Sequence, residues 1–459
     1  MKKLLSLIVL LMAAGMAQAA DYSVLYQQLP IQLKQPSAPS IKEQRVSVTD
    51  YGATGDGQTL CTEAIQKAID DLAAKGGGHV DFPAGIWLTA PIRLKSGIDL
   101  HLERNAIIQM TEERSLHVKP NNKRAENAIY ASDAHDISIT GDGIIDGNGE
   151  FWRAVKKGKN SDVEWKSYLE LGGTTNEKGD IWFPFNLKHQ GNVAATMEKQ
   201  EKLRSNMVRF NNCQRVMVQG VTLQNSPKFH LTPNDCEDVI IDGVTVRCPW
   251  NAQNGDAIDI GTSQRVLIVN NVIDCGDDGI CMKGATGDES VNHKPCEDIL
   301  IKNNSVYHAH GGFVIGSEFS AGMYRIVVCN NTFSGTDTGL RFKSAVGRGG
   351  KTGDIYCYDI MMTDIKDDAV VFETTYADKA VSGTTASVAG SKWVPNFQGI
   401  NIYGITCNGA KTAVKAKGTR EMINNINISK STFFYTKTAA DIDKDCDVKL
   451  QDVKFITYK

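Results

Sequence analysis

The sequence predicts an all-β protein that folds as a right-handed parallel β-helix, and three observations support this prediction. From about residue 210 onward, the chain repeats a pattern of apolar, variable, apolar, two turn-like residues and a further apolar residue. Asparagine pairs recur where the turns are expected, and the amphipathic stretches that a helical solenoid needs are missing from this region. Short strands that alternate between inside and outside at a regular period are typical of a solenoid of strands.

The first twenty residues are expected to act as an export signal and not to belong to the fold. Lys2 and Lys3 precede a short apolar run, and Ala17-Gln18-Ala19 is typical of a signal-peptidase cleavage site. We therefore expect residues 1–19 to be removed and the mature protein to be periplasmic or secreted. The apolar run is shorter than the roughly 20 residues that cross a bilayer, so no membrane span is expected.

The mature chain is predicted to consist of one domain with an N-terminal extension. Residues 20–44 form the extension, and residues 45–459 form a single parallel β-helix domain. In the segment 62–75 the apolar residues fall on one helical face, and three glycines then end the helix. The terminal coils of a solenoid cannot bury their apolar faces alone, so we expect this helix to cap the N-terminal end. A β-helix with capped ends can be a monomer, which is the oligomeric state expected here.

The repeating strands can be aligned on their first apolar residues. The copies begin at Val216, Val239, Val266, Ile299 and Ile326, with intervals of 23, 27, 33 and 27 residues. The apolar residues that follow the turns are Val221, Val244, Val272, Val306 and Phe333. The asparagine pairs are Asn270-Asn271, Asn303-Asn304 and Asn330-Asn331. Asparagine tolerates left-handed backbone, and its amides can stack in ladders on successive coils.

The segment 150–203 interrupts the repeat and is interpreted as an insertion near the binding cleft. It is polar overall, but it contains Trp152, Trp165, Trp182 and Phe183. Long insertions in a solenoid usually emerge on one side and often line a binding face. A surface loop without fixed structure is the alternative, against which the aromatic residues argue.

The charge balance excludes some partners, and the cysteine count bears on disulfides. The 50 basic and 53 acidic side chains give a formal net charge of −3, so no whole-molecule field attracts nucleic acid or an anionic membrane. The chain has eleven cysteines, so at least one is unpaired unless a partner chain supplies a thiol. Cys213, Cys236 and Cys296 each stand three residues before a repeat copy, which favours buried, stacked thiols as the interpretation.

A second apolar strand in each coil carries charged residues in register. Its first apolar residues, the markers, are Ile258, Ile280, Phe313, Leu340 and Val370. The positions around these markers contain Asp256, Asp277, Asp278, Lys283, His310, Arg341 and Lys343. Equivalent positions on adjacent coils lie about 4.8 Å apart. The alignment therefore predicts three carboxylates side by side, a histidine one coil further along and a basic pair on the next coil.

This arrangement is typical of acid-base hydrolysis of a glycosidic bond. Three neighbouring carboxylates repel one another, which raises at least one pKa and favours a proton held near neutrality. One protonated carboxyl can protonate the leaving oxygen while an ionised one activates water, and the basic pair can bind a substrate carboxylate. An ordinary turn, a calcium site and a structural histidine are the alternatives. The sequence leaves inversion and retention of configuration both open.

These residues resemble the motifs of a known family, the polygalacturonases of glycoside hydrolase family 28. Four motifs stand in the family's order, as Asn254-Gly255-Asp256, Gly276-Asp277-Asp278, Ala309-His310-Gly311 and Arg341-Phe342-Lys343. Three residues depart from the family motifs, and all of them leave the charged groups intact. Gly255 replaces a threonine, Ala309 a glycine and Phe342 an isoleucine. The stretches 50–57 and 82–85 are similar to the N-terminal coil of this enzyme group, so the resemblance extends over nearly the whole mature chain.

The resemblance implies an activity and a role for each site residue. The implied activity is inverting hydrolysis of α-1,4-galacturonosidic bonds of pectin or polygalacturonate, with neither a metal nor an organic cofactor. Asp277 would be the general acid, and Asp256 and Asp278 would hold and deprotonate the attacking water. The residues expected to bind substrate are His310, Arg341, Lys343, Tyr376 and Asn254.

The substrate and the mode of attack have alternatives. Rhamnogalacturonan hydrolases of this family tend to lack the histidine and the Arg-x-Lys pair, which favours galacturonate on the leaving-group side here. If the insertion 150–203 walls off one end of the cleft, attack on chain ends follows, and an exo-acting enzyme is expected. A calcium-dependent pectate lyase and a non-catalytic glycan-binding β-helix are the rivals from other classes. The expected partner is a pectic poly- or oligosaccharide.

Overall fold

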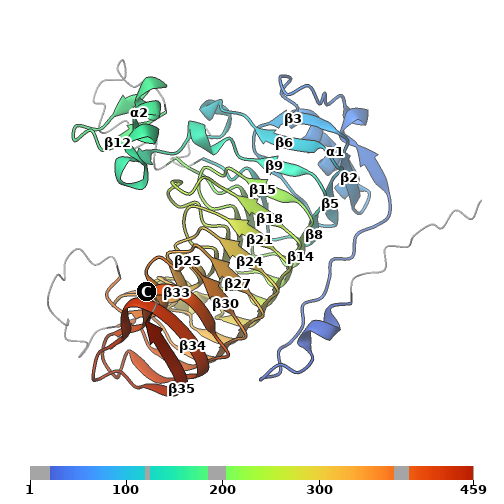
Figure 1. Ribbon diagram of the computed structural model, residues 1–459. Coiled ribbons are helices and arrows are strands. Elements are labelled where there is room, and N and C mark those ends of the chain that lie inside the picture. The colour runs from blue at the N-terminus through green and yellow to red at the C-terminus, as the bar shows by residue number, and fades with distance from the viewer. Residues whose placement is uncertain (1–20, 119–124, 185–202, 377–391, 458–459) are drawn as a thin grey trace, which may run out of the picture.

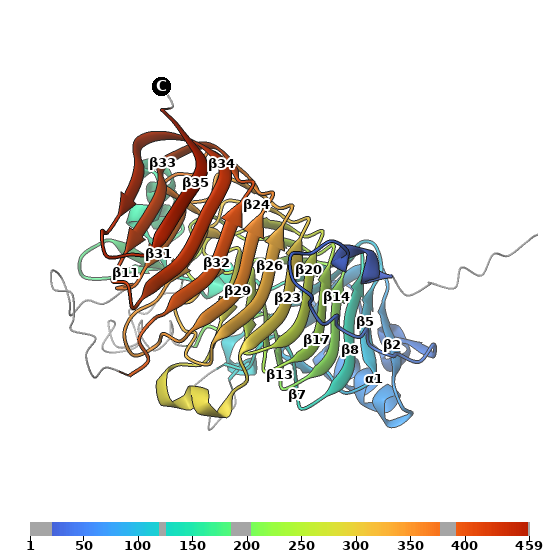
Figure 2. The same cartoon turned by 90° about the horizontal axis from the view of Figure 1, so that it is seen from below.

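The structure, a computed structural model, describes residues 21–118, 125–184, 203–376 and 392–457. Strands stack along an elongated solenoid that runs from β2 (Gly78–Phe82) to β35 (Val448–Thr457) (Figures 1 and 2). Within the described residues, 32 strands form one parallel sheet. The prediction of an all-β parallel β-helix is confirmed. The predicted export signal, residues 1–19, lies outside the described residues.

The strands form three parallel ladders, each made of one strand from every coil. The first ladder consists of β1 (Arg45–Ser47), β2, β5 (Ile98–Leu102), β8 (His135–Gly141), β14 (Gln214–Gln219), β17 (Glu237–Asp242), β20 (Gln264–Val269), β23 (Cys296–Lys302), β26 (Met323–Cys329), β29 (Thr352–Tyr358), β32 (Phe397–Tyr403), β34 (Ile423–Ile442) and β35. The second ladder consists of β3 (Gly85–Thr89), β6 (Ala106–Met110), β9 (Ile144–Asp146), β15 (Thr222–Gln224), β18 (Thr245–Arg247), β21 (Val272–Asp274), β24 (Ser305–Tyr307), β27 (Thr332–Ser334), β30 (Met361–Thr363) and β33 (Thr406–Lys417). The third ladder consists of β4 (Ile92–Arg93), β7 (Ile129–Ser132), β13 (Val208–Asn211), β16 (Leu231–Asn234), β19 (Ile258–Gly261), β22 (Ile280–Lys283), β25 (Gly311–Ile315), β28 (Thr338–Lys343) and β31 (Asp368–Glu373), which pairs with the far half of β33.

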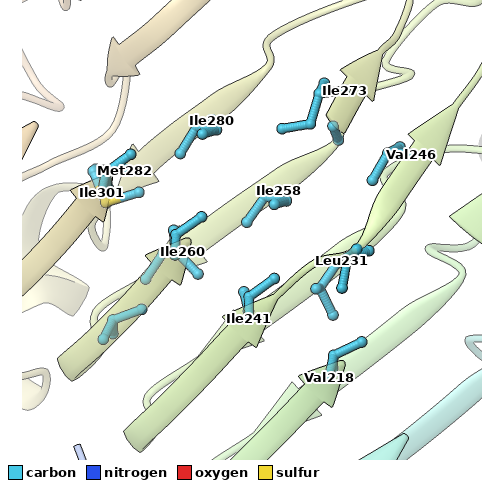
Figure 3. Packing of buried hydrophobic residues seen from close by; sticks show 14 of the residues in the cluster. Val218, Leu231, Ile241, Val246, Ile258, Ile260, Ile273, Ile280, Met282 and Ile301 are labelled. Atoms are coloured by element: carbon cyan, nitrogen blue, oxygen red, sulfur yellow. The ribbon is translucent and has the colours of Figure 1, made fainter. Parts of the chain in front are cut away.

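The first ladder confirms the predicted register of the repeat. The residues that pair from coil to coil are Val216, Val239, Val266, Ile299 and Ile326. Figure 3 shows Val218 and Ile241 of this ladder in one core with Leu231 and Ile258 of the third ladder. Because inward and outward side chains alternate along each strand, one register determines the core residues of every coil.

One of the apolar residues that follow the turns lies outside the core, and a ladder of asparagines explains why. Val272 is 44% exposed, whereas the next residue, Ile273, is fully buried. Thr245 pairs with Val272, so Asn271 takes on the next coil the inward position that Val244 fills. The N–H of Val244 donates a hydrogen bond to the side chain of Asn271. The stacked amides belong to Asn271, Asn304 and Asn331, with side-chain hydrogen bonds of 2.9 and 3.0 Å. The predicted stacking of asparagines is confirmed.

Helix α1 (Thr62–Ala74) covers the N-terminal end of the solenoid, as predicted for residues 62–75. It buries Ile65, Ala68, Ile69 and Leu72 in the core. Gly76 and Gly77 follow with φ angles of 94° and 97°, a backbone that glycine adopts without steric cost. The helix thus covers apolar side chains that the first coil would otherwise expose to water. No helix among the described residues is long and apolar enough to cross a membrane.

The N-terminal extension lies along the outer face of the first ladder (Figure 2). It begins with the 3-10 helix η1 (Tyr22–Tyr26) and continues as chain outside regular secondary structure. Its Leu33 is buried against outward-facing apolar residues of the ladder, namely Ile240, Leu267, Leu300 and Val327. The extension therefore shields an apolar strip that the solenoid would otherwise present to solvent.

An alternating row of aspartates and arginines anchors this extension. The row crosses successive coils of the first ladder as Asp136, Arg215, Asp238, Arg265, Asp298 and Arg325. The backbone N–H groups of Ser40, Ser37 and Lys34 donate to the three aspartates in that order, at 2.9, 3.1 and 3.4 Å. Three residues of extended chain advance about 9–10 Å, which matches two strand spacings of about 4.8 Å.

The insertion folds as a small subdomain beside the solenoid. Its described part contains the helix α2 (Asp162–Glu170) and an antiparallel sheet of β10 (Val155–Lys156), β11 (Thr174–Thr175) and β12 (Ile181–Phe183). Figure 1 shows α2 and β12 standing away from the stacked coils. The side chains of Trp152, Trp165, Trp182 and Phe183 are buried, and Trp165 and Trp182 pack with Val155 and Tyr168 in the core of this subdomain. The remaining 3-10 helices are η2 (Val48–Tyr51), η3 (Arg114–Leu116), η4 (Gly149–Phe151), η5 (Lys157–Lys159) and η6 (Gly287–Asn292).

Ten of the eleven cysteines are buried. Cys213 and Cys236 stand at equivalent positions on adjacent coils, and each thiol donates a hydrogen bond to the carbonyl oxygen two residues before it, that of Asn211 or Asn234. On the next coil Ser263 takes this position, and Cys296 follows one coil later. The interpretation of these cysteines as buried, stacked side chains is confirmed.

Candidate active site

The charged residues identified in the sequence lie on consecutive coils of the third ladder. The markers Ile258, Ile280, Phe313, Leu340 and Val370 pair in the predicted register. Asp256 precedes β19, Asp277 and Asp278 precede β22, and His310 precedes β25. The basic pair lies within β28, two coils beyond Asp277 and Asp278. The register therefore brings the predicted residues into one row on the outside of the solenoid.

Asp277 is held by a histidine and by a backbone amide. Its Oδ1 lies 2.9 Å from Nδ1 of His310, and its Oδ2 accepts a hydrogen bond of 3.1 Å from the N–H of Asn254. Asn254 has a φ of 53°, a left-handed backbone that asparagine tolerates. Burial raises the pKa of Asp277, but the hydrogen bond and charge of His310 and the charges of Lys343 and Lys159 outweigh burial. Together they hold this pKa well below its usual range.

Two buried aspartates lie beside one lysine. The Nζ of Lys283 is 3.5 Å from Oδ2 of Asp256 and 3.6 Å from Oδ2 of Asp259. Burial, followed by the charge of Asp259, raises the pKa of Asp256 well above its usual range. Burial also raises the pKa of Asp259 to about 6. Two like charges in a desolvated place favour a proton held between them.

Asp278 and the basic pair form the other half of the site. Lys343 donates a hydrogen bond of 2.7 Å to Oδ2 of Asp278, and both side chains are buried. Burial lowers the pKa of Lys343, but the charge of Asp278 outweighs burial and raises it. The ring of Tyr376 lies 4.8 Å from Nζ of Lys343 and 5.2 Å from Cζ of Arg341. The structure thus brings Tyr376 next to both basic residues.

Several buried polar atoms of the site have no hydrogen-bond partner in the part of the chain that the structure describes. They are Oδ1 of Asp256, Oδ1 of Asp278, both carboxylate oxygens of Asp259 and Nε of Arg341. Native proteins rarely leave buried polar atoms unpaired, so such atoms mark a place where water or substrate binds. Asp256 and Asp278 therefore each have one oxygen free to bind a water molecule.

The sequence prediction missed Asp259. This residue stands one position after the marker of its coil, the position that Arg341 takes three coils later. The alignment that found Arg341 could therefore have found Asp259. Lys283 stood in the same alignment without a role, and the structure gives it one beside Asp256 and Asp259.

The insertion and its junction supply two cations that no repeat signal could reveal. The Nζ of Lys159 lies 3.2 Å from the carbonyl oxygen of Gly276 and 3.3 Å from Nε2 of His310. Arg204 directly follows the insertion and donates a hydrogen bond of 2.9 Å to Oδ1 of Asn254. The side chain of Asn254, which the sequence predicts to contact substrate, is thus bound to Arg204.

Asp277, Asp278 and His310 are close enough to hold a metal ion, since one ligand atom from each lies within 4.8 Å of the others. The chemistry of their surroundings does not favour calcium. Calcium prefers oxygen ligands, and here one of the three donors is an imidazole nitrogen. The ammonium groups of Lys343 and Lys159 also lie against Asp278 and His310, where they would repel a cation. The group is better suited to proton transfer.

The β-helix and its row of acidic and basic side chains are typical of a glycosidase. The family model described as "Glycosyl hydrolases family 28" matches residues 170–448, which include all four motifs. The chain belongs to this family. A second model, described as "Rhamnogalacturonase A/epimerase, pectate lyase-like", matches residues 45–241, which contain none of the three candidate catalytic aspartates.

Individual relatives agree with this assignment. The chain is 29% identical over 397 residues to an exo-poly-alpha-D-galacturonosidase of Dickeya chrysanthemi, covering 81% of this chain and 64% of that protein. It is 25% identical over 363 residues to an endo-polygalacturonase of Pectobacterium carotovorum subsp. carotovorum, covering 76% of this chain and 78% of that protein. The structure of an exopolygalacturonase from Thermotoga maritima matches with a TM-score of 0.75 and 27% identity, over 92% of this chain and 94% of that one. A family 28 exopolygalacturonase of Yersinia enterocolitica matches with a TM-score of 0.69 and 25% identity, over 90% and 78%.

Proposed function

We propose that the protein hydrolyses α-1,4-galacturonosidic bonds of pectic chains, with inversion at the anomeric carbon and attack from the chain end. The observation that carries this proposal is the register of the third ladder. It sets three carboxylates on two adjacent coils and a basic pair two coils further along. The carboxylates suit acid-base hydrolysis, and the basic pair suits the carboxylate of a galacturonate. The relatives named as galacturonosidase and polygalacturonase support the same substrate class.

Asp256 and Asp278 are the proposed binding groups for the attacking water. Each has a buried Oδ1 without a partner among the described residues, while its Oδ2 faces a lysine. A water bound between the two Oδ1 atoms can lose a proton to one carboxylate as it attacks the anomeric carbon. Inversion follows if this water and the acid lie on opposite faces of the sugar.

Asp277 is the proposed general acid. In the free site the surrounding cations keep its pKa low, so that it is ionised. A bound galacturonate brings negative charge close to His310, Lys159 and Lys343, which counters their effect and raises the pKa of Asp277. The substrate thereby helps Asp277 to take up the proton that it gives to the leaving oxygen. His310 is a positioning residue in this scheme, because it acts through Asp277.

Attack from the chain end is proposed because of the insertion. Lys159 of the insertion contacts His310, and Arg204 at its end contacts the turn that carries Asn254. The insertion therefore lies against the catalytic row on the side of Asp256 and Asp277. The relatives named as exo-acting enzymes support this mode of attack.

A chromatographic product profile on polygalacturonate tests the proposal, with a chelator present and ultraviolet absorbance recorded. We expect saturated galacturonate as the sole early product, and no product from D277N, in which an amide replaces the proposed acid. A ladder of saturated oligomers would contradict exo attack while leaving hydrolysis intact. An absorbing, unsaturated product that disappears with the chelator would indicate a lyase and overturn the hydrolase proposal.

We also propose that the protein is exported to the periplasm or beyond and acts there as a monomer. The basic start, apolar run and small-residue site of residues 1–19 support export. The cover that α1 gives to one end of the solenoid supports a monomer. Cell fractionation and light scattering on the mature chain test these two statements. Protein retained in the cytoplasm, or a mass of two chains, would contradict them.

A further inference from the structure

A second cationic place lies on the other side of the catalytic carboxylates from Arg341 and Lys343. Lys228 and Phe229 stand shortly before β16. The strand β16 belongs to the coil before the one that carries Asp256. The Nζ of Lys228 lies 4.8 Å from the centre of the Phe229 ring, and the Nζ of Lys283 lies 5.3 Å from the same centre. Two ammonium groups therefore lie close to one aromatic ring at the edge of the catalytic row.

These two lysines differ in how their charge is balanced. Lys283 lies within 4 Å of carboxylate oxygens of both Asp256 and Asp259. Lys228 has no carboxylate at ion-pair distance in the described parts of the chain. Burial lowers the pKa of Lys228 and the charge of Arg204 adds to this effect, while the charges of Asp256 and Asp259 oppose it. A half-buried ammonium group without a carboxylate at ion-pair distance is suited to binding an anion.

The order of the charged residues along the solenoid suits a substrate with a carboxylate on every unit. Every unit of a galacturonate chain carries one carboxylate, so the two units that flank the cleaved bond present two. Arg341 and Lys343 lie on the coil two beyond Asp278, and Lys228 lies one coil before Asp256. The carboxylates that cleave the bond thus lie between two cationic places, one for each flanking unit. Phe229 offers an apolar ring surface against which the face of a sugar can pack.

We propose that Lys228 is a specificity-determining residue that binds the carboxylate of the galacturonate unit on the side of the cleaved bond opposite to Arg341 and Lys343. In an enzyme that attacks chain ends from this side, that unit is the terminal one. The inference rests on the proposed function. It adds a requirement that the terminal unit carry a free carboxylate, which a methyl-esterified terminal unit does not satisfy.

The test compares digalacturonate with the same disaccharide methyl-esterified on its non-reducing unit. Lys228→Met keeps the length of the side chain and removes its charge, and we expect it to raise KM for the free acid about tenfold or more with little change in kcat. For the ester, K228M and the wild type should have the same KM, and K228R should recover part of the affinity for the acid. Lys294→Met is the matched control, because Lys294 is an exposed lysine paired with Glu237.

The outcomes separate this inference from the proposed function. If the wild-type enzyme cleaves the free acid and K228M raises KM equally for the acid and the ester, the role of Lys228 is overturned and the proposed function stands. The same conclusion follows if K228M cleaves the free acid as well as K294M does. A wild-type enzyme that cleaves no galacturonate substrate would overturn the proposed function and the inference with it. Thermal unfolding of K228M at the wild-type temperature establishes that the variant is folded.

Discussion

Asp256, Asp277 and Asp278 carry the same carboxyl group, but their neighbours give each a different chemistry. Burial raises the pKa of Asp256, while the cations around Asp277 lower its pKa in the free site. Asp278 is bound by Lys343 at 2.7 Å. A site that gives a proton to one oxygen and takes a proton from another needs carboxyl groups that differ in this way.

Replacing His310 with glutamine tests the control of the proposed acid. Glutamine keeps a hydrogen-bond donor but removes the positive charge, so the pKa of Asp277 rises. The acid then stays protonated to higher pH, and we expect the alkaline limb of kcat/KM to move upward by about one pH unit while kcat falls. Rate profiles against pH for wild type and H310Q measure this shift. An alkaline limb at the same pH in both enzymes would show that another group sets the ionisation of the acid.

Asp259 makes the stability of the fold depend on pH. Its pKa in the folded state is raised from 3.8 to about 6, so the folded protein binds more protons than the unfolded chain in that window. This contribution to stability is fully present below pH 4 and is lost as the pH rises through about 6. Asp259→Asn removes this loss, so its stability relative to wild type should rise by roughly 2–3 kcal/mol between pH 4 and neutrality.

Denaturant unfolding at several pH values measures the effect of D259N. The matched control is Asp142→Asn, because Asp142 is an exposed aspartate that also faces one basic side chain. A stability difference between D259N and wild type that is constant across this pH range would refute the assignment of the raised pKa to Asp259.

At the scale of elements, the N-terminal extension offers a sharp test of how the solenoid is covered. The N–H groups that donate to the aspartate row belong to residues 34, 37 and 40. Pro36 and Pro39, which have no N–H, stand between these donors, so no hydrogen bond to the row is lost at either proline. Ser37→Pro removes the donor to Asp238 and should cost about 1–2 kcal/mol of unfolding free energy. Ala38→Pro is the control, because the amide of Ala38 is not one of these donors. Equal unfolding free energies for S37P and A38P would contradict the anchoring of the extension.

The strand register and most of the site were predictable, because both follow from alternation along short strands. The five markers pair as the sequence predicts, and this alone places Asp256, His310 and Arg341 on their coils. The pattern of apolar residues aligned Val272 with Val244, but the inward position on that coil belongs to Asn271 and Val272 is exposed. A valine and a buried asparagine can fill the same inward position, and a pattern of apolar residues does not distinguish them. Lys159 was not predictable, because the path of a long insertion depends on contacts far apart in the sequence.

In the whole molecule, the solenoid places charged residues that are far apart in the sequence side by side on successive coils. The formal net charge is only −3, yet the cations Lys159, Arg204, Lys228, Lys283, Arg341 and Lys343 gather around the catalytic carboxylates. A neutral molecule with one cationic row suits a chain of acidic sugars, since attraction is confined to the place where the bond is cleaved.

Proton NMR of the first product shows whether these carboxylates hydrolyse an α-linked galacturonide with inversion. The spectrum of trigalacturonate is followed from the first seconds after the enzyme is added, before the released sugar interconverts between anomers. With this substrate and attack at the non-reducing end, the galacturonate monomer comes only from that end and the other product is digalacturonate. Because inversion of an α-linkage gives the β-anomer, we expect the galacturonate released from the non-reducing side to be seen first as the β-anomer. The α-anomer as the first product would contradict it, because the water held by Asp256 and Asp278 could then not be the group that attacks the anomeric carbon.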